Sequence, residues 1–464
     1  MYIRPDRVAA VSERELFRQA ADYAADFLET LDTRSIRAEA DVEELIAALG
    51  GQLPELGLDP RAVIASLVEA AEPGVVANAS GRYFGFVVGG GVPAALTADW
   101  LASAWDQNAA FYVMGPSAAV VEGVCRGWLA ELLGLPLGVS CAFVTGCQMA
   151  HVTALAAARH HVLAQAGWDV ARDGLAGSPP IQVVVGEQRH VTIDRALRLL
   201  GIGSSSLVVL PADDQGRMRV DELRLTAAPT IVCGQAGEVN TGAFDDFHAI
   251  ADACGETGAW FHVDGAFGLW AAVSPELRHL VAGVERADSW TTDGHKWLNV
   301  PYDSGLAFCA HPDSHRAAMA VTASYLVHSQ EPQRRDPMQW TPEASRRARG
   351  FAVYAAIRSL GRSGIVELVE RCCANARRFA AALEEGGAEI LNDVVLNQVL
   401  VRFGDGANTR EVIARVQAEG TCWLGGTEWG GEHAMRISVS NWRTTAEDVD
   451  RSAAAVLAAA GVPA

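Results

Sequence analysis

The chain has 464 residues, 50% of them hydrophobic and 20% charged, so it is long enough for two lobes with buried cores and too apolar for a disordered protein. Its formal net charge of −19 argues against binding to nucleic acid or to an anionic membrane surface, because both require clustered Lys and Arg. No apolar stretch has the length of a membrane span, and residues 1–7 lack the apolar core of a signal peptide. We therefore expect a cytoplasmic protein that binds neither nucleic acid nor membrane.

The 9 cysteines are scattered through the chain. They form no C-x-x-C pair, and no Cys/His spacing typical of zinc occurs. The neighbours Cys372 and Cys373 lie in a helical pattern and fit small, reduced apolar residues better than a disulfide. We expect free thiols and no metal site.

In chain order, residues 1–80 are predicted to form a helical segment, with amphipathic patterns at 13–31 and 41–49. From 81 to 345, short β-branched runs alternate with helical patterns. This alternation indicates crossover connections and a mostly parallel sheet with helices on both faces. The expected strands are at 181–185, 207–210, 230–233, 260–263, 288–292 and 305–309, after an apolar run that ends at Val144.

From residue 346 to 464 the regular alternation is lost. Helices are expected at 346–360, 365–383 and 446–457, and strands at 397–403 and 435–439. The predicted fold is therefore α/β: a large domain at 81–345, built on a mostly parallel sheet, is followed by a small α+β C-terminal domain.

Polar residues follow three of the predicted strands: His190, Asp264 and Lys296. In an open parallel sheet, ligands bind beyond the carboxyl ends of the strands, so we expect these three side chains to converge on one crevice. A desolvated lysine is a usable nucleophile toward an aldehyde. An aspartate can keep a heterocyclic nitrogen protonated, as pyridoxal 5′-phosphate (PLP) requires, and a histidine can stack on a flat ring.

A turn of small residues at Gly146 and Cys147, followed by Gln148, precedes a predicted helix. Backbone N–H groups and the helix dipole favour a phosphate at such a position. Each feature alone has an ordinary explanation: a solvated lysine beside a tryptophan, an aspartate in a turn, a core histidine. Their consistent order favours a PLP site.

Two blocks, FHVDGAFG at 261–268 and TTDGHKWLNVPYDSG at 291–305, resemble the group II PLP-dependent amino-acid decarboxylases. The similarity runs from about residue 82 to about residue 449. It implies the type I aminotransferase fold of PLP-dependent transferases, and a homodimer in which the N-terminal helices wrap the partner. It also implies a carboxy-lyase that converts an amino acid to an amine.

By matching position, Lys296 corresponds to the family's Schiff-base lysine, Asp264 to the partner of the pyridine nitrogen and His190 to the ring-stacking histidine. The resemblance further implies Ala266 on the other face of the ring, Gly146, Cys147 and Gln148 in the phosphate cup, and Asp293 and His295 nearby. The residues implied near the substrate are Phe86, Asn108, Tyr112 (the segment 108–112 often coming from the partner subunit), Glu238, Tyr325, His328 and Arg436.

The chain departs from the family at three places. Where many members carry a loop tyrosine that returns the proton, the matching position is Pro337, which leaves open a second outcome, oxidative deamination to an aldehyde. Tyr325 or His328 could donate the proton in place of that tyrosine. Gln148 replaces a hydroxyl residue in the phosphate cup, and Glu238 replaces Thr or Asn.

Glu238 has two interpretations: a carboxylate that favours neutral or cationic substrates, or a solvated loop residue. For Arg436, a structural ion pair is slightly favoured over binding of the α-carboxylate, because a tight ion pair would stabilise the ground state. The arginines at 346–349 are expected to be paired along a helix.

Three further functions are compatible with parts of the sequence. One is transamination or carbon–carbon cleavage on the same scaffold, and another is a PLP-binding subunit without turnover. The third is a metal hydrolase using His262 and Asp264, which no ligand spacing supports.

Overall fold

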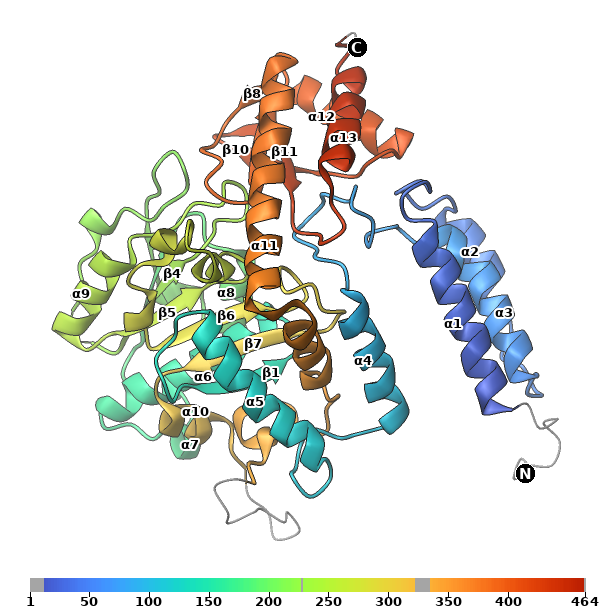
Figure 1. Ribbon diagram of the computed structural model, residues 1–464. Helices are drawn as coiled ribbons and strands as arrows, with labels where there is room; N and C mark the ends of the chain where they lie inside the picture. The colour runs from blue at the N-terminus through green and yellow to red at the C-terminus, as the bar shows by residue number, and fades with distance from the viewer. Residues whose placement is uncertain (1–11, 227, 322–333, 463–464) are drawn as a thin grey trace.

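The computed structural model describes residues 12–226, 228–321 and 334–462. Three N-terminal helices form an arm that projects from a body with two sheets (Figure 1). The arm consists of α1 (Glu13–Glu29), α2 (Val42–Leu49) and α3 (Pro60–Ala71). Asp41 is the N-cap of α2 and forms a capping box with Glu44. The Asp41 side chain accepts the backbone N–H of Glu44, and the Glu44 side chain accepts the backbone N–H of Asp41. In the part of the chain that the structure describes, no helix is both long and apolar enough to cross a membrane.

The large sheet has seven strands in the order β1-β7-β6-β5-β4-β2-β3. β7 runs antiparallel to both of its neighbours, and the other pairs are parallel, so the prediction of a mostly parallel sheet is confirmed. The strands are β1 (Ser140–Val144), β2 (Gln182–Gly186), β3 (Leu207–Leu210), β4 (Thr230–Gln235), β5 (Trp260–Asp264), β6 (Ser289–Asp293) and β7 (Gly305–Cys309).

Both faces of this sheet are buried. In β2, Val183 and Val185 pack in one apolar cluster, whereas Val184 between them packs in another. This division follows from the alternation of side chains along a strand, and it explains why the strands read as near-continuous apolar runs. The helices of this part are α4 (Pro93–Trp105), α5 (Pro116–Leu132), α6 (Cys147–Gln165), α7 (Val170–Asp173), α8 (Val191–Leu199), α9 (Phe247–Thr257) and α10 (Pro312–Met319).

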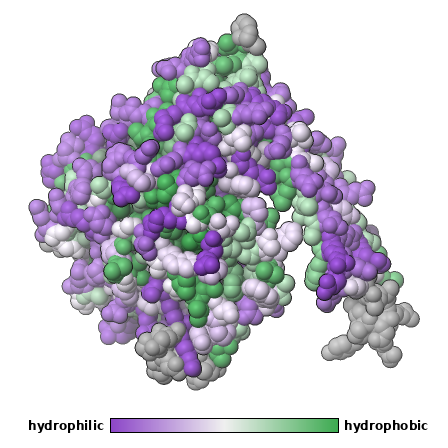
Figure 2. All heavy atoms as spheres, in the orientation of Figure 1, coloured by the Kyte–Doolittle hydropathy of each residue, from purple (hydrophilic) through white to green (hydrophobic). Residues whose placement is uncertain are grey.

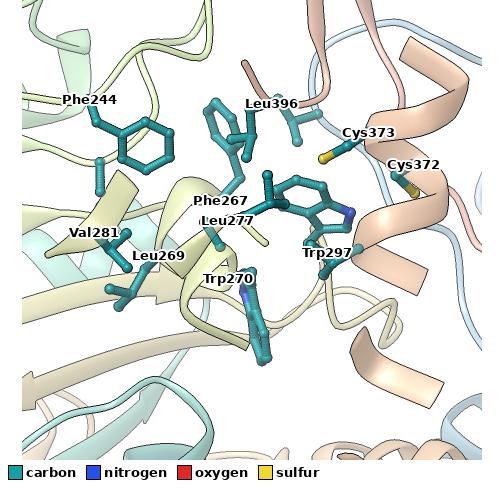
Figure 3. Close-up of a cluster of buried hydrophobic side chains, with 14 of the residues drawn as sticks. Phe244, Phe267, Leu269, Trp270, Leu277, Val281, Trp297, Cys372, Cys373 and Leu396 are labelled. Atoms are coloured by element: carbon teal, nitrogen blue, oxygen red, sulfur yellow. The ribbon is translucent and has the colours of Figure 1, made fainter. Parts of the chain in front are cut away.

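A long helix, α11 (Gly350–Glu385), connects the large sheet to the second sheet (Figure 1). It is interrupted at Gly361, whose φ of 61° and ψ of 178° are non-helical, so the two helices expected on either side of this position are present. In Figure 3, Cys372 and Cys373 of α11 face Trp297 across a buried cluster that also holds Phe267. Trp297 is fully buried and therefore fixes the chain directly after Lys296.

The second sheet is antiparallel, in the order β10-β11-β9-β8, as a small α+β domain requires. The edge strand β10 was not expected, because its glycines carry no strand signal and it forms through pairing with β11. The elements of this part are β8 (Glu389–Ile390), β9 (Gln398–Arg402), α12 (Gly406–Glu419), β10 (Gly425–Trp429), β11 (Glu432–Ser438) and α13 (Ala446–Ala459).

The surface is largely hydrophilic, but Figure 2 shows hydrophobic residues gathered in the middle of the visible face, around α5 and α11. Exposed apolar side chains on α4 and α5 and in the segment between them are Trp100, Leu101, Trp105, Val113, Met114, Val120 and Val124. All nine cysteines are free and buried. Cys372 and Cys373 are reduced residues of the apolar core, as expected.

Candidate active site

Asp264 is the last residue of β5 and pairs in register with Gln235 of β4 and Thr291 of β6. Its Oδ1 accepts the backbone N–H of Ala266 at 3.2 Å, and its Oδ2 lies 3.4 Å from Nε2 of His151. Burial by itself raises the pKa of this carboxyl group, but His151, and after it His190 and Lys296, hold the pKa well below its ordinary range. Asp264 is therefore a buried, ionised carboxylate.

Lys296 follows β6, and its Nζ lies 3.2 Å from Oδ2 of Asp293, the last residue of that strand. The Nζ also lies 5.9 Å from the ring centroid of Phe267. Burial disfavours the charged ammonium, but Asp293, together with Cys147 and Asp264, outweighs this effect, so the pKa of Lys296 is raised. The amine is held in the crevice by an ion pair rather than extended into solvent.

His190 caps the N-terminus of α8. Its Nδ1 lies 2.8 Å from the hydroxyl of Thr192 and accepts the backbone N–H of the same residue at 3.4 Å. Burial lowers the pKa of His190, which favours a neutral imidazole with its proton on Nε2. The Asp264 carboxylate raises the pKa of His190 and the Lys296 ammonium lowers it, but burial has the larger effect.

The turn before α6 approaches the same place. The backbone N–H of Cys147 donates to Oδ1 of Asp293 at 2.6 Å, and His295 Nε2 lies 3.5 Å from this oxygen. β7 comes so close that a Cβ on Gly305 would lie 2.4 Å from Cα of Gly146, so only glycine fits at position 305. Gln148 donates through Nε2 to the Thr192 carbonyl, and its buried Oε1 has no partner within the described part of the chain.

The structure thus brings together a lysine amine, a buried carboxylate on a neighbouring strand, a neutral imidazole and a helix N-terminus. This set of groups matches what PLP needs: an imine-forming lysine, a partner for the ring nitrogen, a flat ring for stacking and N–H donors for a phosphate. The residues present therefore fit PLP.

The comparisons with known proteins agree with this chemistry. The model of the pyridoxal-dependent decarboxylase conserved domain matches residues 43–403. The chain belongs to the pyridoxal-dependent decarboxylase family. It is therefore a PLP-dependent amino-acid carboxy-lyase, as the sequence motifs predicted.

Among its relatives is an aromatic-L-amino-acid decarboxylase of Bacillus atrophaeus, 26% identical over 96% of this chain and 94% of the relative. A 4-hydroxyphenylacetaldehyde synthase of Rhodiola rosea is 25% identical over 92% of this chain and 91% of the relative. The crystal structure of Oryza sativa TDC with PLP and tryptamine superimposes with a TM-score of 0.89, at 22% identity over 99% of both chains. This last similarity establishes the fold.

The residues predicted near the substrate lie in different parts of the structure. Phe86 is 61% exposed and stacks on Trp423, with ring centroids 5.8 Å apart. Asn108 accepts the N–H of Ala110, and the Tyr112 N–H donates to Asp336. Tyr325 and His328 lie outside the described residues.

Glu238 matches neither of its two interpretations. It is buried, and its carboxylate accepts the backbone N–H groups of Asn240 and Thr241, both at 2.7 Å, together with both of their side chains. The carboxylate closes its own loop instead of facing solvent or a pocket. Burial raises its pKa despite these bonds.

The ion pair expected for Arg436 is not present among the described residues. Its Nη1 donates instead to the Val239 carbonyl at 3.2 Å. Burial lowers the pKa of this guanidinium. In contrast, the arginines at 346–349 are paired as expected, in the pairs Arg346–Glu122, Arg347–Asp99 and Arg349–Asp303, but they precede α11 instead of lying along a helix.

Sequence reasoning missed two groups at this site. His151, the residue that contacts Asp264, lies four residues after Cys147, on the same face of α6. Tyr302 is 56% exposed, and its ring lies 4.4 Å from the ring of His295. For His151, the available signal was that His262 and Asp264 share one face of a strand, which indicates a polar partner on the helix packed against that face.

Proposed function

We propose that this enzyme decarboxylates an L-amino acid with an aromatic or other non-acidic side chain to the corresponding amine. The observation that carries the substrate class is a stack of three rings beside the lysine loop. Trp423 lies between Tyr83, with centroids 5.1 Å apart, and the exposed Phe86. Gly89, three residues after Phe86, donates its N–H to the His295 carbonyl, so the stack and Lys296 are in neighbouring segments. An exposed ring face suits an apolar or aromatic side chain.

The names of the relatives support this substrate class, since one is an aromatic-L-amino-acid decarboxylase. The aldehyde outcome rests on Pro337 and on the likeness to a 4-hydroxyphenylacetaldehyde synthase, and it is the second candidate. The ring of Tyr302 lies 4.4 Å from that of His295, the residue before Lys296, so its phenol is a further acid that could return the proton to the former α-carbon and so favours the amine.

The proposed roles follow from the geometry. Lys296 would carry the cofactor, and Asp264 would hold its ring nitrogen protonated. His190 and Ala266 would contact the two ring faces, while the turn at Gly146, Cys147 and Gln148 would hold the phosphate, with Asp293 and His295 nearby. PLP, when bound, supplies the sink for the electrons released with CO2. Arg436 is available to orient the substrate, since it forms no ion pair in the described part of the chain.

We further propose a cytoplasmic homodimer. The exposed apolar side chains of α4 and α5 and of the segment between them form a face that water disfavours. The arm also has an apolar groove between α1 and α3, lined in part by Tyr23, Phe27, Ile64 and Leu67, which a second copy could fill. Asn108 and Tyr112 lie between α4 and α5, where they would reach the partner's site. The proposed domains are 1–80, 81–345 and 346–464, and free thiols suit a reducing compartment.

The experiment is to incubate the PLP-loaded protein with single amino acids in air and to identify products by mass. Tryptophan, tyrosine, phenylalanine, histidine, glutamate and 2,4-diaminobutyrate cover the side-chain classes. We expect amines from aromatic amino acids and no product from the Lys296→Ala control. Aldehyde with peroxide would establish the second candidate, and turnover restricted to glutamate would overturn the substrate class.

A further inference from the structure

A buried chain of hydrogen bonds runs along one face of β5 and leads to Asp264 at the end of this strand. Trp260 Nε1 lies 2.8 Å from Ser289 Oγ, which lies 2.8 Å from His262 Nδ1. His262 Nε2 then lies 3.0 Å from His151 Nδ1, and His151 Nε2 lies 3.4 Å from Asp264 Oδ2. All five side chains are buried. The five side chains therefore form their hydrogen bonds with one another and not with bulk water.

The direction of this chain follows from its donors. The Trp260 indole N–H can only donate, so Ser289 Oγ accepts, and its own proton is available for His262 Nδ1. Burial lowers the pKa of His262 to about 3, so this imidazole is neutral, and the proton it carries is on Nε2. His262 then donates to His151 Nδ1, and the remaining proton of His151 is on Nε2, directed at Asp264.

The opposite direction fails for a neutral His151. A proton on its Nδ1 would leave a lone pair on Nε2 facing the carboxylate of Asp264, which is repulsive. If His151 carried two protons, the order of donors in the chain would reverse, but Nε2 would still donate to Asp264. The hydroxyl of Thr291 lies 3.3 Å from His151 Nδ1 and 3.5 Å from the Val263 carbonyl, and because a hydroxyl both donates and accepts, it is compatible with either order. Every consistent arrangement places an N–H against the carboxylate.

We propose that His151 is a positioning residue that, held by His262 and Ser289, keeps Asp264 ionised and oriented toward the ring nitrogen of PLP. Oδ1 of Asp264 is fixed by the Ala266 N–H and Oδ2 by His151, so the carboxylate is held at both oxygens. The other titratable groups that face it are His190, Lys296 and the thiol of Cys147.

The same geometry distinguishes this role from a metal site. The ligand atoms of Cys147, His151 and Asp264 lie within 4.8 Å of one another and are all buried. A metal ion would need the lone pair of His151 Nε2, but the chain of donors places a proton there. Burial also raises the pKa of the Cys147 thiol, which disfavours the thiolate that a metal binds.

The test uses the full-length enzyme loaded with PLP that carries ¹⁵N in its ring, because the ¹⁵N chemical shift reports directly whether that nitrogen is protonated. We expect a protonated ring nitrogen in the wild type near neutral pH. In His151→Leu we expect loss of this proton and PLP binding weaker by about tenfold or more, since a hydrogen bond to a buried charge is removed. His151→Gln, which keeps an N–H donor, should restore part of both.

Two further variants separate this role from a general effect on folding. Ser289→Ala interrupts the chain of hydrogen bonds at a residue that does not contact Asp264. It should lower the protonation of the ring nitrogen and the PLP affinity as His151→Leu does, but to a smaller extent. His315→Leu removes another buried histidine, bonded to Ser140 and Trp340 instead, and should leave the ¹⁵N shift unchanged. A protonated ring nitrogen and unchanged PLP affinity in His151→Leu would overturn the proposal. The inference rests on PLP binding alone, and neither readout needs a substrate, so failure of the proposed substrate class would leave it intact.

Discussion

Lys296 and Cys147, which are 149 positions apart in the chain, contact the same carboxylate: Nζ of Lys296 lies 3.2 Å from Asp293 Oδ2, and the Cys147 N–H donates to Oδ1 at 2.6 Å. Asp293 therefore ties the amine to the N-terminus of α6. The ion pair keeps Lys296 in place, but it also raises the pKa of the amine against the effect of burial. Because only the neutral amine attacks an aldehyde, Asp293 slows the capture of the cofactor.

We predict that Asp293→Asn speeds the uptake of PLP by the cofactor-free enzyme near neutral pH. The neutral fraction of Lys296 rises about tenfold for each unit by which its pKa falls. The measurement is the rate at which the visible band of the bound cofactor forms, as a function of pH. Asp288→Asn, at a carboxylate bonded to His311, is the control. An unchanged pH profile would contradict the electrostatic role of Asp293.

The buried pair Arg346–Glu122 should be essential for stability. Two bonds of 2.6 and 2.7 Å join the side chains, which are 1% and 8% exposed. Removing one partner leaves the other charge buried and unpaired, so Glu122→Gln should lower the free energy of unfolding by about 3–5 kcal/mol. The exposed pair Arg378–Asp450 is a matched control with similar geometry, and Asp450→Asn should cost about 0–1 kcal/mol. Urea denaturation at one protein concentration measures both, and equal losses would show that burial is not decisive.

His315 should make the enzyme less stable in acid. Burial lowers its pKa to about 3 in the folded protein, whereas the unfolded chain binds the proton near the ordinary value of about 6.5. Its contribution to stability is present above pH 6.5 or so and falls by about 1.4 kcal/mol per pH unit as the pH drops from there toward about 3.

His315→Gln removes this one proton from the balance. Its unfolding free energy should therefore change less than that of the wild type between about pH 7 and about pH 5, by about 1–2 kcal/mol. His279→Gln, at an exposed position bonded only to the carbonyl of Glu276 among the described residues, is the comparison. Identical pH dependence in the wild type and His315→Gln would exclude His315 as the source.

The apolar face on α4 and α5 predicts a dimer that a single charge can break. Leu101 on α4 and Val120 on α5 are 45% and 49% exposed, and a charge buried at either position would be unpaired. Leu101→Glu and Val120→Glu should sediment as monomers with low activity. Leu137 is 98% exposed after α5, and Leu137→Glu should remain a dimer. Sedimentation velocity makes the comparison; a wild type that is itself a monomer would refute the dimer.

Much of the fold followed from the sequence. The expected strands at 207–210 and 305–309 have the same bounds as β3 and β7, and the others differ by one to a few residues at an end. Strands buried on both faces need a run of apolar residues, and this local requirement is visible in a single sequence. The positions of Asp264 and Lys296 near strand ends followed from the same runs.

Residues whose role depends on distant partners did not follow. His151 resembles any polar residue on a helix until His262, 111 positions away, comes within 3.0 Å of it. Glu238 resembles a pocket residue until its loop closes on it, and β10 has no strand signal without β11. The sequence by itself determined the order of the elements and the chemical groups at the strand ends, since both depend on local pattern. Only the tertiary structure decided which groups share a hydrogen bond, because packing alone fixes the partners of a buried polar atom.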